Sequence, residues 1–473
     1  MKKQYIFITV CILSLAFTGC DDYLDINENP NVATEAPLDG LVQRTIYQTP
    51  YNNYRVATSY TNYYVQYFAS PNESSPTDTY DDVDYSSRWA DLYGTMTDAY
   101  DLIRFSQEIN ANNHEAIGKL MMAVNLSLTA DSWSSVPYTA AFTGEIIQPA
   151  YDPADQVYNT IFSLIDEAIQ LINSGSDAGV PATDKDLIYA GNMDLWLKLV
   201  YGLKARYLNH FSKKSTYDPA AVLAATSQGL ESNDDDAQLT TFDVRNPWAQ
   251  AARNNDNLVL DGWLSEQIID AMNGTTFGVV DPRLPLITEP FEEDGKMVFR
   301  GTPNGEGRRG DGTVQEEVYL ETTGFYSMEE SPLILFTYSE QKFIESEAAF
   351  RSGDMDHALA AFMAGIRSNM EKVGVVDDDI TAYLQDKYPG LDASSLSLQQ
   401  IMDEKYIALF LQPETWNDAR RFDYQYTDFS LPANANLSEF IRRLEYPDTE
   451  KSRNGSNVPS IGGLTDPVVW DGQ

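Results

Sequence analysis

Apolar residues recur at helical spacing along most of this chain, and this pattern restricts the fold more than any other feature. Val157, Ile161 and Ile165 follow one another every four residues, and leucines repeat in the same way over residues 194–211. Residues three or four apart share one face of an α-helix. Further helices are expected at about 59–68, 88–105 and 114–133. The sequence therefore predicts an all-α, mainly helical fold.

One segment indicates how some of these helices pair. Gly353, Ala358, Phe362 and Gly365 follow the spacing of the second helix of a tetratricopeptide repeat. The small residues let two antiparallel helices approach, and Phe362 fills the gap between them. We expect tetratricopeptide-like helix pairs to form a scaffold.

Residues 237–332 differ, because they are rich in Asn, Gly, Pro and Asp. We expect long loops there, with one short helix around Trp263 to Met272. Loops carried by a rigid scaffold are common binding sites. No Gly/Ser-rich or Pro-rich linker divides the chain, so residues 38–473 are expected to form a single domain with this loop-rich, ligand-binding insert.

The N-terminus predicts export. A lysine pair precedes a short apolar run that is too short to span a bilayer, which predicts a signal peptide over residues 1–19. Gly19-Cys20 resembles a bacterial lipobox, although Phe17 stands where Leu is usual. Cys20 would then be lipidated, with residues 20–37 as an extended tether. The alternative is an ordinary signal peptide with a chance cysteine.

Composition excludes several classes of partner. The chain has 71 Asp and Glu against 32 Lys and Arg, a formal charge of −39. Such a chain lacks the basic surface that nucleic acid or anionic lipid requires, so acyl chains would be the membrane anchor. It has two cysteines, and Cys11 lies in the signal peptide. No disulfide and no cysteine-based metal site are therefore expected.

The motifs that usually mark enzymes are absent. Residues 305–310 match G-x-G-x-x-G, but no strand pattern precedes them and no helical pattern follows, so we do not predict a dinucleotide site. No catalytic residues and no resident cofactor are predicted. One option stays open: a loosely bound calcium ion among Asp78, Asp81, Asp82 and Asp84, although their spacing is not that of an EF-hand. Otherwise these aspartates belong to a solvated loop.

Residues 401–424 carry a distinctive block. It contains Glu404-Lys405, Ala408-Leu409-Phe410, Glu414, Trp416, Asp418 and Arg420-Arg421, and Arg442-Arg443-Leu444, Tyr446-Pro447 and Glu450 follow it. Together with residues 131–138, 281–285 and 345–354, this order of motifs resembles the SusD/RagB family of Bacteroidetes outer-membrane lipoproteins. One departure is Leu411-Gln412-Pro413, where relatives often have a glycine, and we expect a small change in that turn.

The resemblance implies a non-enzymatic lipoprotein anchored in the outer membrane and facing the cell exterior. Asp21 and Asp22 resemble the export signal that directs such lipoproteins there, or are simply part of an acidic chain. The family covers a SusC-like, TonB-dependent transporter and passes oligosaccharides, or in some members peptides, to it. The shared motifs are expected to be scaffold, with Trp416, Arg420 and Arg421 packing helices and pairing with carboxylates.

A glycan binder needs flat aromatic faces for sugar rings and polar groups for hydroxyls. We therefore predict ligand contacts among loop residues: Trp248, Tyr80, Tyr85, Asp82, Asn304, Arg308 and Tyr326. The tyrosine stripe of Tyr60, Tyr63, Tyr64 and Tyr67 is expected to be a half-buried helix face with its hydroxyls satisfied, and a ligand platform is the alternative. Trp89, Trp133, Trp196 and Trp263 lie on helical patterns and are expected in the core.

Three alternatives remain. A site of backbone-bonding polar groups would favour peptide capture. A surface glycoside hydrolase would need a carboxylate pair about 5 to 9 Å apart in a cleft. A lid without ligand affinity of its own would need neither.

Overall fold

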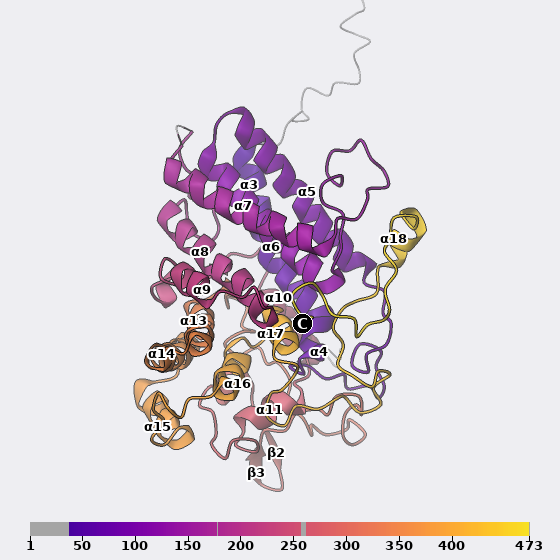
Figure 1. Cartoon of the computed structure of the whole chain (residues 1–473). Coiled ribbons are helices and arrows are strands. Elements are labelled where there is room, and N and C mark those ends of the chain that lie inside the picture. Colours follow the sequence, from indigo (N-terminus) through magenta and orange to yellow (C-terminus); the bar gives the residue numbers. More distant parts are fainter. Residues whose placement is uncertain (1–36, 177, 257–261, 473) are drawn as a thin grey trace, which may run out of the picture.

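The structure is a computed structural model that describes residues 37–472, except residue 177 and residues 257–261 (Figure 1). The predicted signal peptide at 1–19 and the lipidated Cys20 lie outside the described residues, as does the tether at 20–37 apart from Pro37. None of the described helices is long and apolar enough to cross a membrane.

Helices dominate the described chain, and the predicted all-α fold is confirmed. The larger elements are α3 (Leu38–Val56), α5 (Ser86–Glu108), α6 (Asn112–Trp133), α7 (Ala154–Ser174), α8 (Met193–His210), α9 (Pro219–Thr226), α13 (Tyr338–Ser352), α14 (Met355–Val373), α15 (Asp377–Lys387), α16 (Leu398–Ala408), α17 (Glu414–Arg421) and α18 (Asp448–Arg453). α3, α5, α6 and α7 form the upper part of the molecule in Figure 1, and α13 to α16 lie below them.

The four-residue repeat in α7 has the predicted effect. Val157, Ile161 and Ile165 are buried, and the helix places this face against α6. Burying each such side chain contributes about 1.5–3 kcal/mol. α6 packs against α5 as well as α7, and nearly all its residues are buried. α6 is therefore the central helix of the upper bundle.

The predicted tetratricopeptide-like pair is confirmed as α13 and α14. The ring of Phe362 in α14 lies edge-to-face against Phe343 in α13, with centroids 6.3 Å apart. A Cβ on Gly365 would lie only 3.0 Å from the Phe343 ring. The small residue at this position is therefore what lets the two helices approach.

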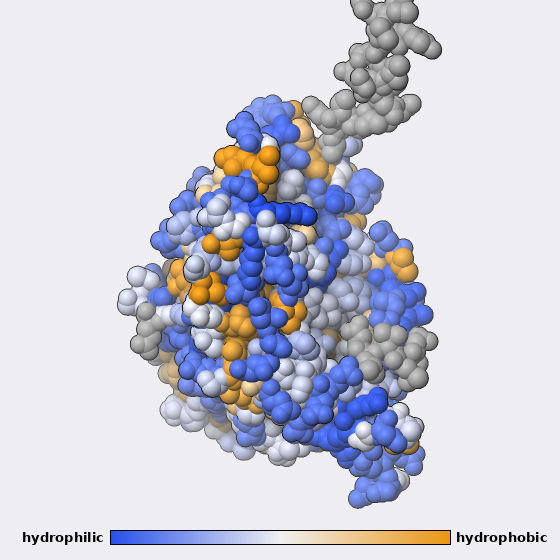
Figure 2. Space-filling view, turned by 90° about the vertical axis from the view of Figure 1, so that its right-hand side faces the viewer, coloured by the Kyte–Doolittle hydropathy of each residue, from blue (hydrophilic) through white to orange (hydrophobic). Residues whose placement is uncertain are grey.

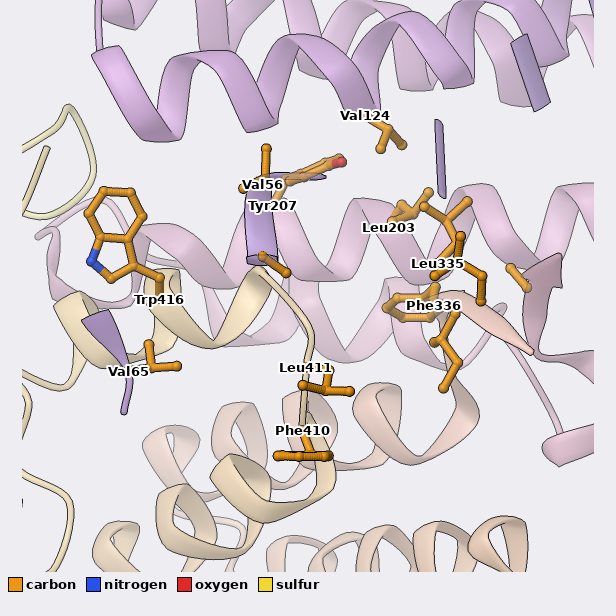
Figure 3. Close-up of a cluster of buried hydrophobic side chains, with 14 of the residues drawn as sticks. Val56, Val65, Val124, Leu203, Tyr207, Leu335, Phe336, Phe410, Leu411 and Trp416 are labelled. Atoms are coloured by element: carbon orange, nitrogen blue, oxygen red, sulfur yellow. The ribbon is translucent and has the colours of Figure 1, made fainter. Parts of the chain in front are cut away.

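Segments distant in sequence share one core (Figure 3). Two short strands, β1 (Ala237–Leu239) and β4 (Leu333–Phe336), pair antiparallel, and β4 brings Leu335 and Phe336 against α8. A Cβ on Gly202 of α8 would lie 2.4 Å from the buried Phe336 ring. The glycine in this helix therefore allows the close approach of β4.

The segment 237–332 contains more structure than the one predicted helix. α11 (Glu266–Met272) matches it, but α10 (Pro247–Asp256) and α12 (Leu284–Ile287) also form, and β2 (Phe291–Glu293) pairs with β3 (Lys296–Val298). α10 and α12 were missed because both are short and begin beside prolines. Their prolines stand near the first turn, where a missing N–H costs little.

The aromatic residues 60–67 also fold differently from the single helix predicted. A π-helix, η1 (Ala57–Thr61), leads into α4 (Asn62–Tyr64), and the chain then turns. Tyr60, Tyr64 and Tyr67 are fully buried and their hydroxyls are hydrogen-bonded. Two 3-10 turns, η2 (Phe211–Lys213) and η3 (Asn233–Asp235), complete the described helical elements.

The C-terminal motif is scaffold, as predicted. Arg421 pairs with Glu347 of α13 at 2.8 Å, and both side chains are buried. The guanidinium of Arg420 lies 3.7 Å from the centre of the Trp416 ring and donates to three backbone carbonyls, those of Trp416, Asp131 and Arg442. This motif therefore joins α17 to the upper bundle and to the helix pair.

The turn before α17 contains a leucine in a backbone conformation that favours glycine. Leu411 has a φ of +67°, in the left-handed region that favours glycine, and its side chain is buried. A non-glycine residue there costs about 1–2 kcal/mol, which burial of a leucine side chain offsets. The buried leucine side chain therefore helps to hold this residue in the left-handed conformation.

Glu404 is a second buried charge in this block. It accepts hydrogen bonds from Lys387 at 2.6 Å and Arg283 at 3.1 Å. Burial alone would raise the pKa of Glu404, but these two cations outweigh it and lower the pKa to about 2.

Candidate functional site

A polar pocket of about 380 Å³ lies beside α11, in the lower part of Figure 1. Its lining comes from four separate stretches of the chain. The residues are Gln66, Glu266, Gln267, Asp270, Thr275, Thr276, Pro303, Asn304, Glu306, Asp428, Ser430, Leu431, Pro432 and Ala433. We call this the polar pocket.

Asp78 holds one wall of the polar pocket in place. Its Oδ2 accepts hydrogen bonds from the backbone N–H of Gly305 at 2.9 Å and of Ser70 at 3.0 Å, and its Oδ1 accepts from Asn304. Burial raises the pKa of Asp78 to about 6, against the lowering effect of these donors. Asp78 therefore ties the segment around residue 304 to the loop after α4.

A glycine allows the next contact. Gly305 has a φ of +84°, and a Cβ there would lie 1.8 Å from the backbone oxygen of Ala433. The backbone N–H of Ala433 donates to the oxygen of Asn304 at 2.9 Å. The segment 430–434 can therefore pack directly on the 303–306 wall only because residue 305 has no side chain.

Two glutamines hold the opposite wall of the polar pocket in place through hydrogen bonds. Gln66 Nε2 donates to the carbonyl of Ser430 at 2.6 Å, and Gln267 Nε2 donates to that of Thr427 at 3.0 Å. Gln66 does so from a left-handed backbone conformation with a φ of +55°. Such conformations are rare for non-glycine residues and are often found at functional sites.

Carboxylates and amides determine the chemistry of the polar pocket. Glu266 pairs with Arg309 at 2.6 Å, whereas Glu306 and Asp428 are exposed. Burial raises the pKa of Asp270 above its usual range, and Glu266 adds to this. These oxygens accept hydrogen bonds from hydroxyl or N–H groups of a ligand. No aromatic residue is among the residues that line the pocket.

The predicted ligand contacts are only partly brought together. Asn304 lies in the polar pocket, where its amide also donates to the carbonyl of Phe68. Arg308 is exposed on the same loop and donates to the backbone oxygen of Asp311. Asp82 is exposed and is not part of the lining. A ligand-binding role for these three residues stays a prediction.

The four predicted aromatic contacts are buried. Trp248 was expected in a loop, and this placement is wrong: it lies in α10, is 2% exposed, and packs edge-to-face on Tyr54. Tyr80, Tyr85 and Tyr326 are also buried. These aromatic residues lie in polar stretches of sequence, but their side chains pack into the core. Their rings therefore present no open face to a ligand in this structure.

Trp263 was predicted in the wrong environment too, but in the opposite sense. It was expected on a helix in the core, but it precedes α11 and is half-buried, and its ring lies 5.8 Å from that of Tyr319. Trp89, Trp133 and Trp196 are buried as predicted.

Sequence reasoning missed most of the polar pocket. Residues 428–433 carried no motif, and neither Glu266 nor Asp270 was predicted as a ligand contact. The one available signal was the glycine-rich stretch 305–310. It forms no strand or helix in the structure.

The four aspartates considered for calcium do not form a cluster. Asp78 is buried and faces the 303–306 wall, whereas Asp81, Asp82 and Asp84 are exposed. Within residues 37–472, leaving aside the gaps, no group of three or more His, Cys, Asp or Glu residues is arranged to hold a metal.

Comparison with known proteins gives the family. Residues 30–447 match the SusD-like family model, whose description is "Starch-binding associating with outer membrane". No curated protein sequence matches the chain. A chitin-binding SusD homolog from Flavobacterium johnsoniae is 19% identical, with a TM-score of 0.76 over 91% of this chain and 98% of that one.

A SusD/RagB family protein from Bacteroides thetaiotaomicron is 22% identical, with a TM-score of 0.74 over 93% of this chain and 99% of that one. At these identities the likeness shows a shared fold. The family match covers nearly the whole chain and confirms the resemblance seen in its motifs. This protein belongs to the SusD-like family.

Proposed function

We propose that this protein is a surface lipoprotein that binds oligosaccharides or polysaccharides through the polar pocket. Family membership over residues 30–447 carries the proposal, because the family is described as starch-binding and outer-membrane-associated. Two proteins of similar fold are described as chitin-binding, which supports a carbohydrate rather than another nutrient.

The side chains of the polar pocket support this proposal. Sugar hydroxyls need hydrogen-bond acceptors, and the carboxylates of Asp270 and Glu306 supply them. Trp263 is half-buried and stands three residues before Glu266, and its ring lies 5.8 Å from that of Tyr319. We propose this pair as a platform for a sugar ring beside α11.

Delivery forms the second part of the proposal. We propose that the bound glycan passes to a SusC-like, TonB-dependent transporter, with this chain held at the outer membrane by acylated Cys20 and facing outward. The protein would act by binding alone, without catalysis.

Peptide capture is a second candidate, and one observation favours it. The residues lining the polar pocket are mainly polar, and none of them is aromatic. A peptide needs backbone-bonding groups more than stacked rings. Four acidic side chains would favour a basic or neutral peptide over an acidic one.

The test is calorimetry of residues 21–473 with malto-oligosaccharides, chito-oligosaccharides and a panel of short peptides. Saturable binding of one glycan class, without product formation, supports the proposal. Binding of peptides without binding of any glycan would favour peptide capture, the second candidate function. Release of shortened glycans that Asp270→Asn abolishes would instead show a hydrolase.

Variants locate the site. Glu306→Gln keeps the shape of an exposed lining residue while removing its charge and one strong acceptor, so glycan affinity should fall about three- to tenfold. Glu330→Gln is the matched control, since Glu330 is an exposed acid outside the pocket lining. Equal loss in both variants would mean that general charge, not the polar pocket, controls binding.

A further inference from the structure

A second cavity, of about 270 Å³, lies in the helical part of the molecule and shares no lining residue with the polar pocket. It is formed by α7, the end of α8, the turn through η2 to the start of α9, and the C-terminal segment. The lining residues are Asp155, Tyr158, Asn159, Phe162, Leu208, Phe211, Thr216, Tyr217, Asp218 and Val469. We call this the apolar cavity.

Aromatic rings form much of its wall. The Phe211 ring lies 5.3 Å from that of Tyr158 and 6.1 Å from that of Phe162. The Tyr158 hydroxyl is used elsewhere: it donates to Asp131 and lies 3.0 Å from His210 Nδ1. Tyr158 therefore contributes its ring, not its polar atom, to the cavity.

The polar groups of the lining are acidic or neutral. Asp155 and Asp218 form no ion pair within the described part of the chain, and no Lys or Arg is among the lining residues. The neighbouring Lys213 is bound to Asp423 at 2.7 Å and Asp471 at 3.2 Å. The cavity thus combines aromatic walls with two exposed carboxylates that form no ion pair within the described residues.

We propose that the apolar cavity binds an organic cation: a protonated amine carried on an aromatic or branched apolar group. The apolar part would be buried against Phe162, Phe211 and Leu208. The ammonium would gain from the aromatic faces and from Asp155 and Asp218 at once. An anion would meet two like charges, and a neutral ring would gain no electrostatic attraction from either carboxylate.

The strongly acidic surface supports the same ligand charge. At a formal charge of −39, the protein attracts small cations from solution before any specific contact forms. Asp218 can serve the ligand while keeping its structural role, because only its Oδ1 is used to cap α9 by accepting from the N–H of Ala220 at 3.0 Å.

Three probes of similar shape separate the interactions: phenethylammonium, 2-phenylethanol and phenylacetate, each titrated calorimetrically into residues 21–473. We expect the cation to bind about tenfold more tightly than the neutral alcohol, with the anion weakest. Added salt should weaken binding of the cation and leave the alcohol unchanged. Equal binding of cation and alcohol would overturn the proposal.

Variants identify the cavity. Asp155→Asn with Asp218→Asn should remove most of the preference for the cation, and Asn keeps the α9 cap. Asp356→Asn is the control, because Asp356 is likewise an exposed acid in the first turn of a helix, α14, outside the cavity. If the double variant keeps the wild-type preference for the cation, the assignment of these carboxylates is wrong.

A second variant guards against folding artefacts. Asn159→Trp places a ring into the cavity from an exposed position of α7 and should block the cation while circular dichroism stays unchanged. Glu306→Gln in the polar pocket should leave cation binding unchanged. The proposal for the apolar cavity is therefore tested independently of the proposal for glycan binding. A neutral sugar that binds here more tightly than phenethylammonium would overturn the proposal.

Discussion

Replacing Gly305 by alanine should disrupt the polar pocket more than any other single methyl group added there. The backbone at residue 305 has a φ of +84°, and a non-glycine residue in that conformation costs about 1–2 kcal/mol. The new Cβ would also lie 1.8 Å from the carbonyl oxygen of Ala433, so backbone must move. Overpacking of this kind costs about 1–3 kcal/mol more.

The total loss expected for Gly305→Ala is therefore about 2–5 kcal/mol in the free energy of unfolding. Gly390→Ala separates the two contributions. Gly390 has a φ of +71°, but an added Cβ there meets nothing within 4 Å. It should lose only the conformational part, about 1–2 kcal/mol.

Urea unfolding followed by circular dichroism measures both variants, and calorimetry with a bound glycan or peptide measures the site. Gly305→Ala should lose affinity because segment 430–434 lines the polar pocket, whereas Gly390→Ala should bind normally. If Gly305→Ala loses no more stability than Gly390→Ala and binds as well, the packing of that segment on Gly305 is not what shapes the pocket.

Three further changes test the scaffold. Arg421→Met leaves the buried Glu347 without its main partner and should lower the free energy of unfolding in urea by about 3–5 kcal/mol. The double variant Arg421→Met with Glu347→Met should lose less. Equal losses in the two variants would contradict the buried ion pair. Gly202→Ala gains about 1 kcal/mol of helix propensity but forces a methyl group to 2.4 Å from Phe336, so a net loss in melting temperature is expected, and a gain would refute the close approach. The pKa of Glu404 is depressed to about 2 in the folded protein, so its contribution of about 3 kcal/mol is present above pH 4.5 and is lost as pH falls towards 2. Glu404→Gln should flatten the pH dependence of unfolding in that window, and an unchanged slope would assign the dependence to other groups.

The long helices could be predicted from sequence because one physical signal, burial of one face, repeats every turn. α7 and α14 follow it residue by residue, and small residues such as Gly365 mark where a second helix approaches. The short elements gave no such repeat. α10 has too few turns to show a period, so the apolar ring of Trp248 looked like a loop residue.

The polar pocket was harder to predict for a different reason. Its residues become neighbours through contacts with backbone groups of segment 427–433, such as that between Gly305 and Ala433, and these contacts do not require particular residue types in that segment. Asn304 was predicted because it stands in a glycine-rich loop, but nothing in residues 428–433 pointed to the same place.

The hydrogen bond from Gln66 to Ser430 has a consequence for the order in which the molecule folds. It joins residues 364 positions apart, and closing a loop of that length costs about 5 kcal/mol of chain entropy. Contacts with such separation form slowly compared with those inside a helix. During refolding, the helical circular dichroism signal should therefore recover before ligand binding does. A chain that ends before residue 428 would form most of its helices but would lack the binding site.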